Sequence, residues 1–420
     1  MTSSAARAIN VPVRLISRRA RLMLGCALAG VTAMAAHPQA AAAQSADHGG
    51  AFEGFITSAT PDVHRNITSS TTETIVLGQS KATINWSPYD NSGSGNIDFL
   101  PQGHVVTFTN EVDVSDFTVL NRIVPGTSGR AIELNGKVIG QIQSQAGTVT
   151  GGHIWFYSPG GIIIGSTAIF DVGGLLLTTN DPGANWDANA TGFSGAFNAA
   201  SGSMAKIVIN PGAQINATPQ NSYIAVIAPR IEQHGTINVN GSAALVAGER
   251  LTMTMDQGLF DIQVDIGTSD AKGIVHTGTT GGAASTAADD YHRIYLVAVP
   301  KNQALTMVLS GKIGFAPATS ASLENGQIIL SAGSNIADSG AGFTATQAGG
   351  ASAEIDIGAG TYSSDVAAIA SGDIDVLAGT GAIAFAGDVT LNSLGGIGDG
   401  NVTLGASNGH ALTIGGDLLM

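Results

Sequence analysis

The chain has 420 residues, of which 57 are glycine, 44% are hydrophobic and only 11% are charged. Intrinsic disorder is excluded, because disordered chains are poor in apolar residues and rich in charge, and collagen is excluded because the glycines follow no three-residue period. The net charge of −14 excludes nucleic acid as a partner, since its recognition needs basic residues that displace counterions from phosphates.

Residues 1–43 have the three parts of a secretory signal peptide. All basic residues of this segment are arginines, the last of them Arg21, and no acidic residue lies among them. An apolar stretch over 22–36 follows, which is too short to span a bilayer. Small residues then lead to Ala41-x-Ala43, a suitable site for signal peptidase. We therefore predict export through the Sec translocon and removal of residues 1–43.

Two other export signals use the same residues. Ser17-Arg18-Arg19 resembles a twin-arginine signal, although Arg21 lies where an apolar residue is wanted. Leu24-Gly25-Cys26 resembles a lipoprotein site, although almost no apolar run precedes it. Cys26 is the only cysteine, so the mature chain would contain none, which excludes disulfides, zinc-thiolate sites and cysteine nucleophiles.

From about residue 75, short runs of β-branched and apolar residues alternate with Gly, Asn or Asp. Such runs favour strands, and helical periodicity with caps is nearly absent. The strictest alternation covers 260–266, where Asp261 and Asp265 lie on one face of the expected strand. Other strands are expected at Lys206–Ile209, Thr236–Val239, Leu251–Met255 and Glu354–Ile357.

Recurrence distinguishes between the all-β architectures. Gly212–Ala217 is repeated as Gly235–Asn240, which places Ile215 and Ile237 22 residues apart. Near the C-terminus a Gly-Asp/Asn-apolar motif recurs at intervals of 15, 13 and 16 residues, and we expect a coil of about this length. Repeats of this kind are typical of solenoids. We predict an all-β, right-handed parallel β-helix, with ladders of Ile, Val and Leu inside and Gly, Asn and Asp at the corners.

The stacking pattern divides the chain into regions. Residues 44–74 are expected to form an N-terminal lead or cap, and 266–420 to form further coils. Asn180–Ser203 and a small-residue loop at 277–290 are expected to leave the coils as short hairpins or loops. The sequence stops inside a repeat at Leu418–Met420, which we interpret as a fragment or a truncated form.

An ordered series of motifs lies between residues 75 and 265. It consists of Ile84–Asp90, Gly95–Phe99, Leu120–Val124, Leu134–Val138, Gly151–Phe156, Ser158–Gly165, Phe170–Leu175, Ser222–Pro229 and Ala244–Glu249. In order and register, the series resembles the N-terminal domain of filamentous haemagglutinin, the secretion module of two-partner-secretion (TpsA-type) exoproteins. We therefore interpret 75–265 as a domain of this kind.

The chain departs from the family at one turn. Where the family usually has Asn-Pro-Asn-Gly, this chain has Ser158-Pro159-Gly160-Gly161, and we find no clear copy of the family's more N-terminal Asn-Pro motif. Proline presets the first central residue of such a turn, and we expect Gly160 to adopt the positive φ that Asn would otherwise tolerate.

The resemblance implies a route and a partner. Members cross the inner membrane through Sec, reach the periplasm, and thread unfolded through an outer-membrane TpsB-type barrel with POTRA domains. Outside, at the cell surface or secreted, the module folds first and templates further coils. The resemblance also implies an adhesin or haemagglutinin-like role with a host-cell or glycan receptor.

Nine positions match the family's motifs and carry its implied role in partner recognition and secretion. They are Asn85, Trp86, Asn121, Arg122, Ser158, Pro159, Gly160, Gly161 and Ile162. For the pair Asn121-Arg122 two interpretations stand side by side: recognition of the partner, or a buried hydrogen-bond anchor.

No catalytic, metal or cofactor site is expected. Asp261 and Asp265 could serve acid–base chemistry or calcium, but the solvent face of a β-helix strand is the preferred interpretation. Gly395–Asp399 resembles the calcium-binding nonapeptide of repeat toxins, yet its Asp is one position early and the unit does not recur in tandem. The histidines show no paired metal spacing; they include His104, His153, His234 and His276.

Two alternative functions remain open. The first is a β-helical polysaccharide-degrading enzyme, which would gather carboxylates with Lys or Arg on one strand face. No such cluster is visible in the sequence. The second is the passenger of an autotransporter, which requires a C-terminal barrel of alternating strands; a truncated sequence would hide it.

Overall fold

The computed structural model describes residues 50–90, 93–189, 191–287, 290–320, 323–395 and 400–420. The expected signal peptide over 1–43 and residues 396–399 of the calcium-like motif lie outside the described residues. Every element in these ranges is a strand. Accordingly, the described part of the chain has no helix of the length and apolarity needed to cross a membrane.

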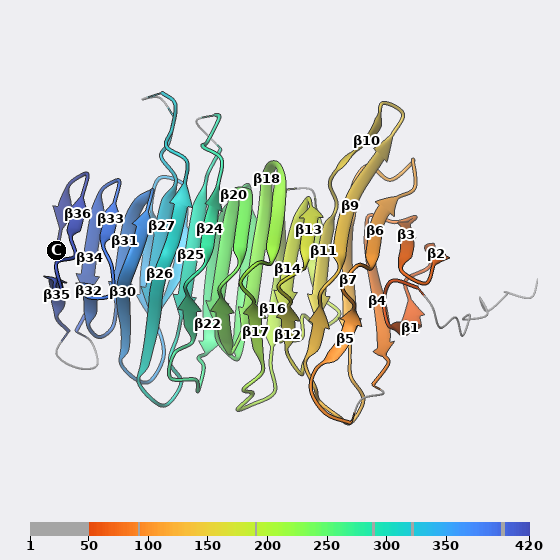
Figure 1. The fold of residues 1–420 in the computed structure, drawn as a ribbon, viewed down its shortest axis with the longest axis horizontal. Coiled ribbons are helices and arrows are strands. Elements are labelled where there is room, and N and C mark those ends of the chain that lie inside the picture. The colour runs from red at the N-terminus through yellow and green to blue at the C-terminus, as the bar shows by residue number, and fades with distance from the viewer. Residues whose placement is uncertain (1–49, 91–92, 190, 288–289, 321–322, 396–399) are drawn as a thin grey trace, which may run out of the picture. The chain divides into compact units, whose positions relative to one another are not determined.

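Successive strands run around three faces, and each pairs in parallel with its counterpart in the next coil, which confirms the predicted parallel β-helix. Figure 1 shows these strands side by side in chain order. Face 1 contains β3 (Thr72–Leu77), β6 (Val105–Asn110), β9 (Lys137–Ser144), β13 (Ile169–Val172), the starts of β18 (Gln214–Ala228) and β20 (Thr236–Ala247), β24 (Thr279–Gly282), the ends of β26 (Leu305–Phe315) and β30 (Ala353–Tyr362), β33 (Ile383–Phe385) and β36 (Leu412–Ile414).

Face 2 is the only face whose strands are buried on both sides over much of their length among the described residues. It contains β4 (Lys81–Pro88), β7 (Thr118–Ile123), β11 (His153–Tyr157), β14 (Gly174–Thr178), the ends of β18 and β20, β25 (Arg293–Ala298), β27 (Gln327–Ala332), β31 (Asp365–Ala370), β34 (Val389–Ser393) and β37 (Leu418–Leu419).

Face 3 shows how the interior is filled. It contains β5 (Ile97–Leu100), β8 (Ile132–Leu134), β12 (Ile162–Ile164), β17 (Lys206–Ile209), β19 (Arg230–Gln233), β23 (Ile274–His276), the starts of β26 and β30, β32 (Ile374–Ala378) and β35 (Val402–Ala406). Register places six buried isoleucines one above another: Ile97, Ile132, Ile162, Ile207, Ile231 and Ile274. Burial of each such side chain contributes roughly 1.5–3 kcal/mol.

An antiparallel cap closes the first coil. The strand β1 (Gly54–Ala59) pairs with β4, and β2 (Val63–Ser69) pairs with β3, both antiparallel. Phe52, which precedes β1, is buried and stacks on Phe99 with a centroid distance of 4.7 Å. The cap therefore supplies the apolar contacts that a preceding coil would supply elsewhere, as predicted.

A second sheet lies outside the coils and packs on the outer surface of face 2. Its antiparallel strands are β15 (Asp187–Asn189), β16 (Gly192–Asn198), β21 (Arg250–Asp256), β22 (Leu259–Ile266), β28 (Ser334–Asp338) and β29 (Phe343–Gln347). Between this sheet and face 2 lies a second apolar core, which includes Trp155, Phe193 and Met253. A hairpin of β9 with β10 (Gly147–Thr150) also leaves the coils.

The second sheet corrects one expectation. Asp261 and Asp265 are exposed, as expected, but β22 belongs to the second sheet and not to the β-helix. Strict alternation arises because only one side of β22 is buried, whereas the covered strands of face 2 are apolar on both sides.

The expected small-residue loop at 277–290 is also partly wrong. Thr279–Gly282 forms β24, a strand of face 1 between β20 and β26. Added Cβ atoms at Gly281 and Gly282 would come within 1.9 Å of the carbonyls of Gly314 and Val239. Small residues are therefore required here by close stacking of coils, and they do not mark a loop.

The C-terminal repeat has twice the expected length. Ile374 pairs with Val402, and Val389 pairs with Leu418, so each coil contains two copies of the Gly-Asp/Asn motif. The Asp388 carboxylate accepts a hydrogen bond from the backbone N–H of Asp417 in the next coil, at 2.8 Å. Both corners of a coil use the same chemistry, which is why one motif recurs at half the coil length.

A buried polar cluster interrupts the apolar interior where face 3 turns into face 1. His276 is fully buried; its Nδ1 lies 2.9 Å from the Ser310 carbonyl, and its Nε2 lies 2.9 Å from Thr280 Oγ1. Gln233 Nε2 donates to the same hydroxyl at 3.1 Å. Burial lowers the pKa of His276 from 6.5 to about 4, so the folded chain holds this ring neutral.

We expect His276 to make the fold sensitive to acid. The unfolded ring protonates below its ordinary pKa of 6.5 while the folded ring stays neutral down to about pH 4. The free energy of unfolding therefore does not depend on this ring above pH 6.5. As the pH falls from 6.5 toward 4, protonation of the ring in the unfolded chain lowers the free energy of unfolding by about 1.4 kcal/mol per pH unit. Urea unfolding of wild type and His276→Gln at pH 7.5, 5.5 and 4.5 measures the difference, and parallel pH dependence of the two proteins would contradict it.

Candidate functional site

Asn121 connects three consecutive coils from within the interior. Its side chain, on β7, is fully buried. Trp86 Nε1 on β4 donates to Asn121 Oδ1 at 3.0 Å, and Asn121 Nδ2 donates to the Trp155 carbonyl on β11 at 3.2 Å. Both ends of one amide are thus satisfied by different coils, so the geometry is that of a buried hydrogen-bond anchor.

Arg122 points the other way, toward the outside of face 2. It forms a two-pronged ion pair with Asp181, at 2.6 and 2.7 Å, and its guanidinium lies 4.8 Å from the centre of the Tyr157 ring. The hydrogen bonds from Arg122 lower the pKa of Asp181, and burial raises the pKa of Tyr157 to about 12. Because Asp181 begins the segment that leads into β15, Arg122 fixes the start of the second sheet.

Lys81 performs a similar task one coil earlier, and sequence reasoning missed it. Its Nζ donates to the Trp186 carbonyl and lies 4.4 Å from the centre of that ring. Lys81 on β4 and Arg122 on β7, two adjacent strands of face 2, therefore both bind the segment that precedes β15. No motif in the sequence marks Lys81, since its partner lies 105 residues away.

Asn85 and Trp86 tie the cap to this layer. Asn85 Nδ2 donates to Ser58 Oγ on β1 at 2.8 Å, and Thr57 Oγ1 donates to the Asn85 carbonyl at 3.1 Å. The guanidinium carbon of Arg65 lies over the Trp86 ring, 5.0 Å from the ring centroid. These contacts place the first pair of expected site residues at the join between cap and first coil.

The turn Ser158–Gly161 differs from its expected geometry. Gly161 N donates to the Ser158 carbonyl at 3.3 Å, which closes the turn over Pro159 and Gly160. The positive φ, of 118°, belongs to Gly161 and not to Gly160. Gly160 is required for a different reason, because an added Cβ would lie 2.3 Å from the backbone oxygen of Arg130 in the preceding coil.

The structure brings the expected residues together into one region, hereafter the Asn121 layer, which comprises all nine. Asn85 pairs with Arg122 across β4 and β7, and Tyr157, directly before Ser158, pairs with Arg122 across β7 and β11. Five of the nine are buried: Trp86, Asn121, Ser158, Gly161 and Ile162. Pro159 is exposed, and Asn85, Arg122 and Gly160 are partly exposed.

Glu249 is a further residue whose role the sequence did not reveal. It ends the motif Ala244–Glu249 and is 2% exposed. Its Oε2 accepts from Lys301 Nζ at 2.6 Å and from Gly202 N at 3.0 Å. Glu249 therefore joins the connection between β16 and β17 to the connection between the coil strands β25 and β26.

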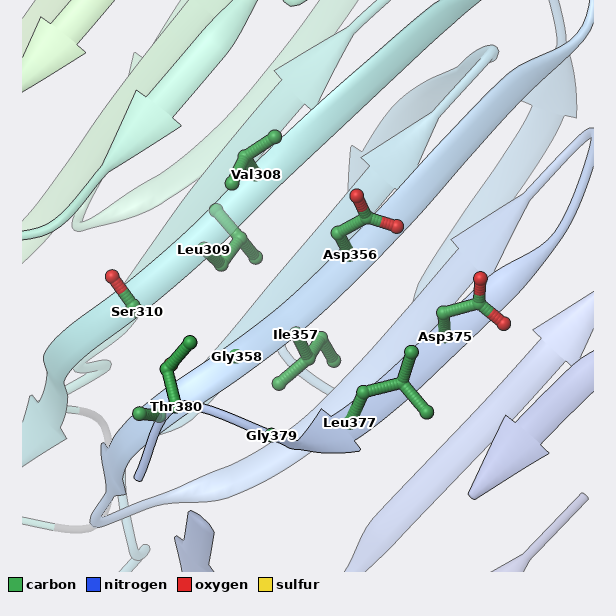
Figure 2. A pocket seen from close by; sticks show the side chains of 11 residues that line it. Val308, Leu309, Ser310, Asp356, Ile357, Gly358, Asp375, Leu377, Gly379 and Thr380 are labelled. Atoms are coloured by element: carbon green, nitrogen blue, oxygen red, sulfur yellow. The ribbon is translucent and has the colours of Figure 1, made fainter. Parts of the chain in front are cut away.

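A pocket of about 450 Å³ lies near the C-terminal end of face 3. Asp356 on β30 and Asp375 on β32 pair in register, and Figure 2 shows their carboxylates on the same side of neighbouring strands. Burial and then the charge of Asp375 raise the pKa of Asp356. None of the described residues that line the pocket is a lysine or arginine, which the hypothesis of a polysaccharide-degrading enzyme places beside such carboxylates. Across the described ranges, no three His, Cys, Asp or Glu side chains gather as a metal site would need.

Comparison with known proteins gives a match to the TPS secretion domain over residues 57–339, more than half of the chain. The chain belongs to the TPS secretion domain family. The resemblance seen in the sequence is thereby confirmed. The TPS match includes every residue of the Asn121 layer and all of the second sheet except β29.

Two solved structures are similar to this TPS chain. The filamentous hemagglutinin secretion domain is 11% identical, with a TM-score of 0.39, and the match covers 85% of this chain and 99% of that chain. The HMW1 secretion domain from Haemophilus influenzae is 16% identical, with a TM-score of 0.39 and coverage of 87% and 99%. No curated protein matches the chain.

Membership places the chain among two-partner-secretion exoproteins, which are secreted and have a TpsB transporter as their partner. The matched family is a secretion domain.

Replacing Asn121 with Ala should destabilise the TPS domain by about 3 kcal/mol, because Trp86 Nε1 and the Trp155 carbonyl lose a buried partner. Denaturant unfolding followed by tryptophan fluorescence measures the change. Asn238→Ala, at a half-buried position on the outward side of β20, is the control and should shift the midpoint little. Equal effects of the two substitutions would show that Asn121 is no anchor.

Gly160→Ala should also destabilise the TPS domain, by roughly 1–3 kcal/mol, because the new methyl group must displace the backbone of Arg130. Gly126→Ala is the matched control, since a Cβ there meets nothing within 4 Å and the residue has no positive φ. Thermal unfolding compares the two variants. A Gly160→Ala midpoint at or above that of Gly126→Ala would refute the close-packing argument.

Proposed function

We propose that this chain is the secretion module of an exoprotein that crosses the inner membrane through Sec and the outer membrane through a TpsB barrel with POTRA domains. The observation that carries the proposal is the TPS match over 57–339. The arginine-containing leader over 1–43, its signal-peptidase site, and the lack of cysteine beyond Cys26 support passage through the periplasm in an unfolded state. The boundaries 75–265 for the secretion domain and 266–420 for further coils remain predictions.

The Asn121 layer has a double role in this proposal. In the folded chain, five of its nine residues are buried and can contact no partner. In the unfolded chain all nine are accessible. We therefore assign recognition by the transporter to the segment before it folds, and assign to the same residues the task of fixing the first coils once they have crossed the membrane.

The proposal extends to an adhesin or haemagglutinin-like role for the folded surface. Face 1 supports it, because its outward side carries amides and hydroxyls in register from coil to coil. These include Gln214, Thr236 and Thr279 in one ladder and Asn216 and Asn238 in the next. Such groups suit hydrogen bonding to a host-cell glycan. Agglutination of erythrocytes by the purified protein is the direct measurement.

Secretion can be tested with and without the transporter. The chain should appear in the medium only when a POTRA-barrel transporter is present, and otherwise remain in the periplasm. Pro159→Ala tests recognition, because the Pro159 side chain is exposed in the folded structure. Asn121→Ala tests both roles together, so the variant should bind immobilised POTRA domains less tightly in its unfolded state and should also lose stability once folded.

Two results would count against the proposal. Secretion that persists in cells lacking every POTRA-barrel transporter would remove the transporter from the route. Failure of the unfolded wild-type chain to bind POTRA domains would remove the assigned recognition segment.

A further inference from the structure

A buried ion pair holds the cap onto the first coil. Arg65 Nη2 on β2 lies 2.7 Å from Glu73 Oε2 on β3, and Glu73 is fully buried. Arg65 also donates to the carbonyls of Gly54 and Phe52, at 3.0 and 3.1 Å. The same guanidinium lies over Trp86, whose indole N–H is bound to Asn121. The cap is thus bonded directly to the Asn121 layer.

The contacts then pass from the interior to the outside of face 2. Asn121 Nδ2 holds the backbone of Trp155, and the Trp155 side chain points away from the interior. Its Nε1 donates to Tyr223 Oη at 2.8 Å, and its ring lies 4.8 Å from Trp186 and 5.3 Å from Phe193. Trp155 therefore links the coils to the second core, because its backbone lies on β11 and its side chain lies in the second core.

Within the second core the contacts continue toward the far end of the sheet. The ring centroids of Phe193 and Phe260 are 6.0 Å apart, and those of Phe260 and Tyr295 are 5.4 Å apart. Tyr295 Oη donates to Asp338 Oδ2 at 2.9 Å, and Asp338 is 3.5 Å from the buried Arg293 guanidinium. The unbroken series, here called the relay, consists of Glu73, Arg65, Trp86, Asn121, Trp155, Phe193, Phe260, Tyr295, Asp338 and Arg293.

Ordinary solenoids lack such a relay. Their coils contact only their neighbours, so stability is a sum of local terms and damage decays from coil to coil. Here, strands drawn from residues 187–347 lie across coils formed between β7 and β27. A coil beneath the second sheet cannot unfold without losing its contacts with that sheet. Because the same sheet packs on the neighbouring coils, unfolding of one coil also disturbs the others. The coils that contain β33 to β37 contribute no residue to the second core.

We infer that the described residues of 50–347 form one cooperative unit, coupled end to end by the relay, and that the coils containing β33 to β37 open independently of it. The unit includes the whole of the TPS match, which ends at residue 339, directly after Asp338. The secretion domain would then be defined by the reach of its second sheet and not by a number of coils.

Hydrogen exchange read by mass spectrometry tests the inference on the purified full-length protein. Asn121→Ala should speed exchange at least tenfold in β21 and β22, as well as in β4 and β7, and leave β33 to β36 unchanged. Reciprocity of coupling requires the converse. Asp338→Asn, at the other end, should speed exchange in the cap strands β1 and β2.

A matched control disturbs the other part of the chain. Phe385 on β33 is buried and stacks on Tyr362 at 4.9 Å, so Phe385→Ala should speed exchange in β33 to β36 and leave β21 and β22 unchanged. If Asn121→Ala does not fold, Tyr223→Phe replaces it, since that variant removes only the bond to Trp155. Exchange that rises only in the strands next to each substitution and fades coil by coil would overturn the inference.

Discussion

Everything in the first coils depends on a single amide that is satisfied from two sides. Asn121 lies among apolar side chains, where an unpaired amide costs several kcal/mol, and its partners come from the coils before and after it. A slip of one residue in either coil would break one bond and turn every side chain to the opposite face. The apolar ladders themselves resist that slip. A slip of two residues would keep apolar side chains inside but would break the hydrogen bonds of Asn121, which explains why a polar residue occupies the interior there.

The second sheet follows from the same geometry. Once register is fixed, the outward side of face 2 presents Leu120, Trp155 and Leu176 in one row. Left exposed, such a row is an aggregation hazard. The cations Lys81 and Arg122, at the start of the row, hold the segment that leads into β15. The covering strands are thereby anchored next to the Asn121 layer, so cap, coils and second sheet meet at one place.

The sequence predicted the parallel β-helix and the stacking of Ile215 on Ile237, because each leaves a local pattern of alternation or repetition. It did not predict that β22 leaves the coils, since one-sided burial looks the same on either sheet. It placed the positive φ at Gly160 because turn chemistry can be inferred from four residues, whereas the contact with Arg130 depends on the preceding coil. Among the residues of the candidate site, Asn121 and Arg122 could be predicted from the sequence. Asp181 and Lys81 could not, because their partners are more than fifty residues away.

Aspartates at the corners of the C-terminal coils have a structural role. Asp365 accepts from the backbone N–H of Asp388 at 3.0 Å, and Asp388 accepts from that of Asp417 at 2.8 Å. Carboxylates stacked in this way repel one another, yet each is compensated by an amide that the turn leaves without a strand partner. A basic side chain could not replace them, because the corner needs an acceptor. Repetition of this corner adds negative charge without requiring a cation or metal, and a secreted solenoid can therefore grow more acidic with each coil while remaining stable.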